Sequence, residues 1–112
     1  MIDLEILRRV QATLEERRKA APGTSYVASL YAKGTDSICK KVAEEAAEAI
    51  MAAKDGDRLH LVREVTDLWF HSMILLSHFG VSVDDVACEL RRREGISGID
   101  EKKSRTQEHG HE

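Results

Sequence analysis

Two pairs of carboxylates stand at helical spacing in this sequence, and both pairs lie among apolar residues. Glu45 and Glu48 are three residues apart, and Glu64 and Asp67 repeat that spacing after fifteen intervening residues. At about 100° per residue, each pair lies on one face of a helix. Desolvating several carboxylates together costs several kcal/mol per ion unless a cation balances them. The pattern therefore predicts a cation site between two acidic helix faces.

The segment between the two pairs allows them to meet. Asp55-Gly56-Asp57 is typical of a turn, and Glu48 and Glu64 lie on either side of it, each about eight residues from its centre. In an antiparallel hairpin the two acidic faces would stand at similar height. Oxygen ligands without clustered cysteine or imidazole suit a hard ion, so we expect Mg²⁺, with Mn²⁺ as a substitute. Such an ion bridges to phosphate oxygens, which indicates phosphate chemistry.

Neighbouring side chains have the chemistry to complete such a site. Glu44 borders the first acidic face, and a glutamate that is not fully used as a ligand can take a proton from water. Lys41 and Lys54 can supply cationic contacts to a polyphosphate. Two other readings stay open: the first acidic face is an ordinary solvated helix surface, or the acids hold a di-iron centre. The second needs two Glu-x-x-His elements, whereas Glu64 begins a Glu-x-x-Asp pattern.

Hydrophobic periodicity and capping residues predict the helices that position these acids. The expected cap residues are Asp3, then Thr35 or Asp36, then Asp57, and finally Ser82 with Asp85 as a capping box. The helix after Asp57 is apolar nearly all round, which is typical of the middle of a bundle. The expected helices cover about residues 4–20, 25–33, 35–54, 58–78 and 82–93.

Composition sets the class of protein. With 112 residues, 42% hydrophobic, 33% charged and 4% aromatic, the chain is expected to form one all-α domain, a bundle of four to five helices. A formal charge of −3 without a long basic run argues against a nucleic-acid partner. No apolar stretch is long enough for a membrane span and no secretory signal is recognisable, so we expect a cytoplasmic protein. Cys39 and Cys88 are isolated and are expected to be small buried residues, not disulfide or zinc ligands.

The two ends of the chain differ in character. Residues 1–95 are expected to form the helical domain, and residues 96–112 a polar tail that is mobile unless substrate or a partner orders it. Four or five helices, one of them short, make a thin core for one chain. Dimerisation is therefore expected to complete the bundle.

Longer stretches of the sequence resemble a known family. They are SYVASLYAKGTDSICKKVAEEAAEAIMAAKDGD, EVTDLWFHSMILL and ELRRREGISGIDEKKSR. The paired acids resemble the metal-binding signature of the all-α NTP pyrophosphatase (MazG-like) superfamily. The surrounding segments, which cover nearly the whole chain, resemble the phosphoribosyl-ATP pyrophosphatase family within it.

This resemblance implies a function and a set of site residues. The implied reaction is Mg²⁺-dependent hydrolysis of phosphoribosyl-ATP to phosphoribosyl-AMP and diphosphate, the second step of histidine biosynthesis, in a homodimer or higher homo-oligomer. The implied metal ligands are Glu45, Glu48, Glu64 and Asp67, and the catalytic acids are Glu44 and Glu45. The implied substrate-binding residues are Lys41, Lys54, Tyr26, Lys33 and Gly34.

Two other functions stay open at this point. A house-cleaning nucleoside triphosphate pyrophosphatase would use the same metal site on aberrant nucleotides, and a non-catalytic helical interaction module would carry the acids as surface charge. Two single residues also allow two readings. His71 either contacts a ligand or substrate, or is a satisfied histidine inside the bundle. Trp69 points away from the acids by helical phase and is expected in a core or a subunit interface.

Overall fold

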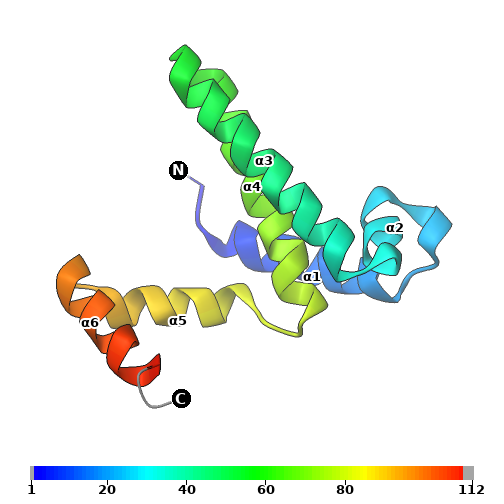
Figure 1. Ribbon diagram of the computed structural model, residues 1–112. Helices are drawn as coiled ribbons and strands as arrows, with labels where there is room; N and C mark the ends of the chain where they lie inside the picture. Colours follow the sequence, from blue (N-terminus) through cyan, green and yellow to red (C-terminus); the bar gives the residue numbers. More distant parts are fainter. Residues whose placement is uncertain (1, 110–112) are drawn as a thin grey trace.

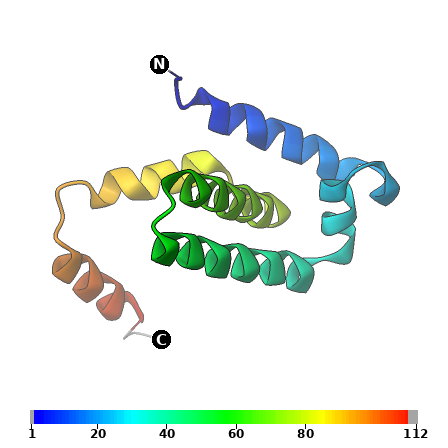
Figure 2. The ribbon, with the colours of Figure 1, turned by 90° about the horizontal axis from the view of Figure 1, so that it is seen from above.

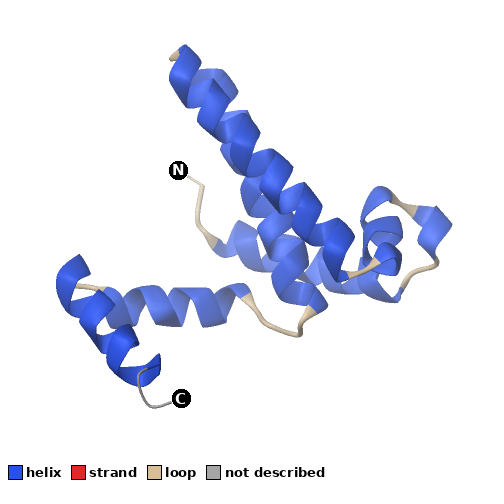
Figure 3. Ribbon diagram, viewed as in Figure 1, coloured by secondary structure: helices blue, strands red, loops and turns tan. Residues whose placement is uncertain are grey.

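The computed structural model describes residues 2–109, and within that range every regular element is a helix (Figure 1; Figure 3). The number of α-helices is six, one more than the five expected segments. None of the helices in this range has an apolar stretch that could cross a membrane. In chain order the elements are α1 (Glu5–Lys19), η1 (Pro22–Thr24), α2 (Tyr26–Lys33), α3 (Thr35–Asp55), α4 (Arg58–His78), α5 (Val83–Arg93) and α6 (Gly98–His109).

Two of the four predicted capping residues begin their helices as expected. The N-cap of α1 is Leu4 and not Asp3, although Asp3 accepts a hydrogen bond from the Glu5 backbone N–H at 2.9 Å. Asp57 accepts a hydrogen bond from the His60 backbone N–H at 3.1 Å and begins α4. Ser82 and Asp85 form the expected capping box of α5. The predicted cap of α3 is wrong, because α3 begins at Thr35 with Gly34 as its N-cap and no side-chain cap bond. Gly34 also ends α2 and has a φ of 95°, so one glycine serves both helices and leaves no position for a polar cap residue.

The core lies where α1 and α2 meet one end of the α3–α4 pair. Ile38 and Ile74 are fully buried, and Leu14 is 1% exposed. The remaining buried members of this cluster are Leu30, Tyr31 and Met73. The apolar stripe of α1 covers this end of the pair, so the core anchors α3 and α4 at the bottom of the view in Figure 1.

Helices α3 and α4 form the antiparallel hairpin that the Asp55-Gly56-Asp57 turn predicts. Gly56 adopts a left-handed conformation with φ 74°, which ends α3 without strain. Ala49 and Ala52 are 8% and 0% exposed, and such small side chains allow the two helices to approach closely. The hairpin extends well beyond the core, because α1 and α2 cover only one of its ends (Figures 1 and 2).

Helices α5 and α6 form an arm, residues 83–109, that diverges from the hairpin after α4 (Figure 1). At its base Arg8 of α1 bonds Asp84 at 2.6 Å, and Gln11 accepts from the Val83 backbone N–H at 2.7 Å. The radius of gyration is 16.5 Å, above the about 13 Å expected for a compact domain of this length. The α6 helix falls in the segment for which the sequence predicts a polar tail, and the mobility of that tail without substrate stays a prediction.

The cysteines differ from expectation in one respect. Cys39 and Cys88 are free thiols, as expected, but both are exposed, so their predicted burial is wrong. Cys88 lies on α5, which buries none of its residues, and Cys39 lies on α3 next to the fully buried Ile38 but on another face of the helix.

Candidate active site

The hairpin brings three of the predicted metal ligands together. Glu45 and Glu48 of α3 and Glu64 of α4 each offer a carboxylate oxygen, and these oxygens all lie within 4.8 Å of one another. The three residues are called the acidic cluster below. Two helices thus contribute to one site at mid-hairpin, as the spacing about the turn predicts.

The acidic cluster is partly desolvated and incompletely satisfied. Glu45 is 7% exposed and the Glu64 side chain 14%. One oxygen of each, Oε2, is buried without a hydrogen-bond partner among the described residues. A buried carboxylate oxygen without a donor is costly. Three converging carboxylates with two such oxygens fit a hard divalent cation, which takes oxygen ligands of this kind.

Repulsion within the cluster also changes the protonation of Glu48. A hydrogen bond to Glu64 and the charge of that residue raise the Glu48 pKa above its ordinary value. Burial adds to the shift, and Lys41 opposes it. The two carboxylates thus favour sharing a proton when no cation stands between them.

Lys41 lies beside the cluster on α3. Its Nζ is 3.3 Å from Glu44 Oε2 and 3.5 Å from Glu45 Oε1. The hydrogen bond to Glu44 is the main reason that the Lys41 pKa is raised, so the ammonium stays charged. The structure thereby joins the predicted substrate-binding lysine to the two predicted catalytic acids. Glu44, at 44% side-chain exposure, faces solvent next to the buried Glu45.

His60 is a site residue that the sequence analysis did not select. Its Nε2 lies 3.1 Å from Glu64 Oε1, the oxygen that does have a partner. The signal in the sequence was the spacing of four residues between His60 and Glu64, which places both on one helix face. A histidine is common on an exposed first turn, so this spacing alone did not distinguish it.

His71 is a buried histidine with both ring nitrogens hydrogen-bonded. It is 6% exposed, and its Nδ1 donates to the Asp67 carbonyl at 2.8 Å. With Nδ1 carrying the proton, Nε2 of the neutral ring accepts from the Tyr26 hydroxyl, also at 2.8 Å. Of the two readings of His71, the structure favours the satisfied histidine. Its effect on the site is to hold Tyr26 against α4.

The remaining predicted site residues lie around the acidic cluster but not in it. Asp67 is exposed and outside the set of converging ligand atoms, although its charge contributes to the raised pKa values of Glu48 and Tyr26. Lys54 follows Glu48 by six residues, about 9 Å along the helix axis. Lys33 and Gly34 lie at the other end of α3, just before its first residue. Their predicted roles stay predictions.

Trp69 lies on the opposite side of α4 from the acids. It is 57% exposed, so the expectation of a core tryptophan is wrong for this chain, and the interface alternative stays a prediction. The reason is that α1 covers only part of the apolar surface of α4. An apolar groove of about 530 Å³ remains, lined in part by Ile6 and Val10 of α1 and by Val62, Trp69 and Met73 of α4.

The fold and the site together define a class of protein: an all-helical protein whose acidic cluster, suited to a divalent cation, spans an antiparallel helix pair. Comparison with known families makes this specific. The sequence model of the family described as phosphoribosyl-ATP pyrophosphohydrolase matches residues 7–94. The chain therefore belongs to the phosphoribosyl-ATP pyrophosphohydrolase family, and it is an enzyme, a hydrolase.

Close relatives agree with this assignment over nearly their whole length. A protein of Azoarcus sp. named phosphoribosyl-ATP pyrophosphatase is 79% identical over 105 residues, which cover 94% of this chain and 98% of the relative. Proteins of the same name from Aromatoleum aromaticum and Chromobacterium violaceum are 77% and 64% identical, over 95% and 90% of this chain and 98% and 94% of theirs. Pyrophosphohydrolases commonly need a divalent metal, which agrees with the chemistry of the acidic cluster.

Proposed function

We propose that this chain hydrolyses phosphoribosyl-ATP to phosphoribosyl-AMP and diphosphate, the second step of histidine biosynthesis, at the acidic cluster between α3 and α4. Family membership and the relatives' shared name support the reaction. The observation that carries the location is the pair of buried, unpartnered Oε2 atoms of Glu45 and Glu64. Burying carboxylate oxygens without a hydrogen-bond donor costs free energy, and a bound cation would offset that cost.

The cation that suits this donor set best is Mg²⁺, with Mn²⁺ as a substitute. Glu45, Glu48 and Glu64 would hold it, and Asp67, which is exposed on the same side of α4, would complete the set. When bound, a divalent ion of this kind neutralises charge on the polyphosphate and its leaving group. All the ligands come from two helices anchored by the core, which keeps them in place.

The chain's own residues account for the proton transfer. Water adds to phosphorus, the bond between the α and β phosphates breaks, and diphosphate leaves. A carboxylate must take the proton from the attacking water. Glu44 and Glu45 are the candidates, because both lie beside Lys41 and each retains an oxygen that can accept. Lys41 stabilises their ionised forms and keeps a positive charge next to the phosphates.

The other predicted substrate-binding residues bracket the acidic cluster along α3. Lys54 lies toward the hairpin turn, and Lys33 and Gly34 lie at the start of the helix. Tyr26 stands between, held by His71 on α4. A substrate with a triphosphate at one end and a phosphoribosyl group at the other is long enough to need anionic contacts at separated points. This arrangement supplies them on both sides of the acidic cluster.

The proposed assembly is a homodimer. The hairpin exposes large apolar side chains, among them Ile50 at 61%, Val62 at 62% and Trp69 at 57%. Apolar surface of this extent on one helical hairpin marks an association site in a soluble protein. The family resemblance implies a homo-oligomer, so the expected partner is a second copy of the chain.

Diphosphate release tests the proposal. Purified protein is given phosphoribosyl-ATP, ATP or dCTP, each with Mg²⁺ and with EDTA in its place. We expect release from phosphoribosyl-ATP alone, and only with Mg²⁺. Release from dCTP in preference would replace the proposal with house-cleaning nucleotide hydrolysis, and release from none would contradict enzymatic function at this site.

A further inference from the structure

His71 connects the backbone of α4 to the phenol of Tyr26 on α2. The histidine is 6% exposed, and its ring meets the rings of Tyr26 and Phe70 edge to face, with centroids 5.8 and 5.7 Å apart. Its Nδ1 lies 2.8 Å from the Asp67 carbonyl oxygen, and its Nε2 lies 2.8 Å from the Tyr26 hydroxyl oxygen. Two hydrogen bonds and two aromatic neighbours therefore fix the orientation of the ring.

The partners of the ring decide which nitrogen carries the proton. A carbonyl oxygen can only accept, so Nδ1 of His71 must donate to Asp67. In the neutral ring Nε2 is then an acceptor, and the Tyr26 hydroxyl must donate its hydrogen to it. A phenol has one hydroxyl hydrogen, so none is left for a second partner. Tyr26 therefore presents only the lone pairs of its oxygen to the rest of the site.

The phenol oxygen lies among charged groups. Burial raises the pKa of Tyr26, and the charge of Lys41 opposes that rise. Three carboxylates add to the rise, those of Glu45, Glu44 and Asp67. In return Tyr26 adds to the raised pKa of Lys41, which is due mainly to the hydrogen bond with Glu44. Of the charged neighbours of this oxygen, Lys41 is the one that can donate a hydrogen bond.

Lys41 has a donor to spare for Tyr26. An ammonium group has three N–H donors, and Nζ of Lys41 approaches two carboxylates, Glu44 Oε2 at 3.3 Å and Glu45 Oε1 at 3.5 Å. A phenol oxygen that can only accept suits the third N–H. A lysine side chain is flexible and loses rotamer freedom when it binds an anion. Holding the ammonium in place before the substrate arrives lowers that cost.

We propose that His71 is a positioning residue of the reaction: it fixes Tyr26 as a hydrogen-bond acceptor, and Tyr26 holds the Lys41 ammonium in place for the phosphates of the substrate. The proposal rests on the function proposed above and gives Tyr26 a defined role in it. Tyr26 then contacts the lysine and not a phosphate oxygen. A phosphate oxygen needs a donor, which a phenol bonded to His71 no longer offers.

Nitrogen NMR of His71 tests the direction of these hydrogen bonds without any ligand. Protein labelled with ¹⁵N in histidine is measured at roughly pH 8, where an ordinary imidazole is neutral. We expect the proton on Nδ1 and a bare Nε2, whose chemical shift should change in Tyr26→Phe. His71→Gln removes the signal and so assigns it. A proton on Nε2 would overturn the proposal, because the Tyr26 hydroxyl could then donate to phosphate.

Calorimetric titration with inorganic triphosphate and Mg²⁺ tests the role of Tyr26. This ligand has phosphate oxygens but no sugar or base. We expect Tyr26→Phe to weaken its binding about tenfold, because the ammonium loses a partner that holds it. Tyr31→Phe, the same change at the other tyrosine of the chain, is the matched control. The Tyr31 hydroxyl is buried without a hydrogen-bond partner among the described residues, so its loss should leave the affinity unchanged. Unchanged affinity in Tyr26→Phe as well would contradict the proposal.

Two further titrations identify the group that Tyr26 contacts. In a Lys41→Met background, Tyr26→Phe should cause no further loss of triphosphate affinity. If the loss persisted there, Tyr26 would donate to phosphate directly and the proposal would be wrong. ATP adds ribose hydroxyls to the same phosphates. If Tyr26→Phe weakened binding of ATP but not of triphosphate, the phenol would accept from the sugar, and its role toward Lys41 would be wrong.

A pair of amide substitutions at His71 separates positioning from packing. The oxygen of a glutamine can reach the position of Nε2 and accept from Tyr26, whereas the shorter asparagine reaches only the position of Nδ1. We expect His71→Gln to keep the triphosphate affinity within about twofold. His71→Asn should lose as much affinity as Tyr26→Phe, with no further loss when the two are combined. Equal losses in both His71 variants would mean that the ring only packs. If both variants fail to fold, the Tyr26→Phe titrations and the NMR result decide.

These measurements keep the positioning role apart from the proposed reaction. Wild-type protein that gives the expected NMR and binding results but does not hydrolyse phosphoribosyl-ATP would contradict the reaction alone. An active enzyme with the proton on Nε2 of His71 would contradict the positioning role alone.

Discussion

At the scale of single residues, Glu64 separates the two roles that an acid can have in this protein. Its Oε1 has a partner in His60, and its Oε2 is buried without one. In a purely structural protein such an oxygen would be a defect that replacement relieves. In a metal enzyme it is a ligand. Replacing Glu64 should leave activity unchanged if the residue is only structural, and should abolish activity if the residue is a metal ligand. In both cases the replacement should not lower the stability of the metal-free protein.

We therefore expect Glu64→Gln to lower turnover of phosphoribosyl-ATP by more than about a hundredfold without unfolding the protein. In EDTA its melting temperature should equal or exceed that of wild type, because one repelling carboxylate is gone. Addition of Mn²⁺ should raise the melting temperature of wild type and leave that of the variant unchanged. Glu16→Gln, an exposed acid on α1, is the control. A variant that retains the wild-type rate and the Mn²⁺ response would remove Glu64 from the site.

The sequence predicted most of the site's composition but less of its geometry. Glu45, Glu48 and Glu64 converge because helical phase and distance from the turn are both local properties. Asp67 has the same spacing from Glu64 and yet stays outside the converging set. The partner of Tyr26 could not be read from the sequence either, because its bond to His71 joins residues 45 positions apart.

At the scale of elements, local signals located the helices and tertiary contacts decided the rest. Asp57 and Ser82 begin their helices where predicted, because an N-cap needs only its own first turn. The α6 helix has no comparable apolar stripe, and its attachment depends on ion pairs to Arg92 and Arg93 on another helix. Periodicity contains no information on such pairs.

The turn of the hairpin offers a matched pair of acids with which to test capping. Asp57 accepts from the His60 N–H, whereas Asp55 is the last residue of α3 and lies near the negative end of that helix dipole. We expect Asp57→Ala to lower the free energy of unfolding by about 1 kcal/mol. Asp55→Ala should leave it unchanged or raise it slightly. Urea denaturation of both variants measures the free energy of unfolding. Equal losses of stability in the two variants would mean that the removed charge matters and not the cap hydrogen bond.

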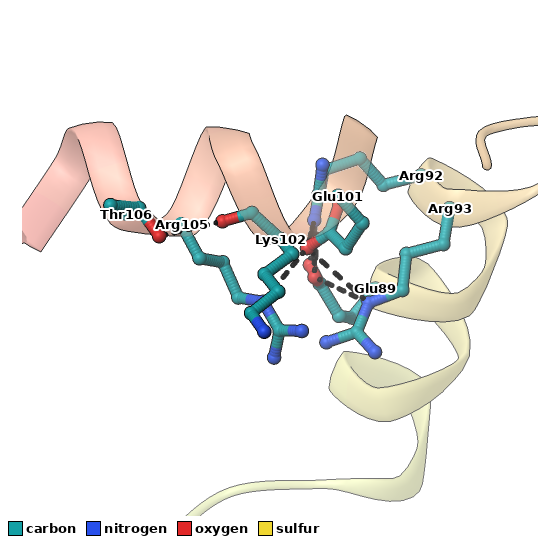
Figure 4. A network of polar contacts seen from close by, with 7 residues as sticks. All are labelled: Glu89, Arg92, Arg93, Glu101, Lys102, Arg105 and Thr106. Atoms are coloured by element: carbon teal, nitrogen blue, oxygen red, sulfur yellow. Dashed lines mark hydrogen bonds and ion pairs between the residues drawn. The ribbon is translucent and has the colours of Figure 1, made fainter. Parts of the chain in front are cut away.

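The ion pairs within α5 should depend on pH. Hydrogen bonds from Arg92 and Arg93 lower the pKa of Glu89 to about 2 (Figure 4). A lowered pKa in the folded state means that the carboxylate stabilises the end of α5 above its ordinary pKa of 4.5, and that this stabilisation is lost as pH falls toward 2. NMR titration of the Glu89 side chain should give a midpoint near 2. Replacing both arginines by glutamine should return it to the ordinary range, and a wild-type midpoint already there would contradict the ion pairs.

At the scale of the whole molecule, the contacts within one chain do not account for its open shape. The radius of gyration exceeds that of a compact domain, and Trp69 is 57% exposed beside an apolar groove. The sequence analysis expected this tryptophan in a core or in an interface between subunits. Its exposure rules out the core of a single chain, and the interface stays a prediction. Association of copies would cover the groove and complete the bundle.

Trp69 is the one tryptophan of the chain, so intrinsic fluorescence reports on this surface alone. If a second copy covers it, the emission maximum should lie at short wavelength at high protein concentration and move to longer wavelength on dilution, as the indole becomes exposed. Sedimentation should show dimer and monomer over the same concentration range. Val62→Lys, which puts a charge in the same groove, should fix the emission at long wavelength and leave a monomer, whereas Lys19→Gln should change neither. If the emission does not change while dimers dissociate, the two copies meet through another face, and the groove beside Trp69 remains open to solvent in the assembled enzyme.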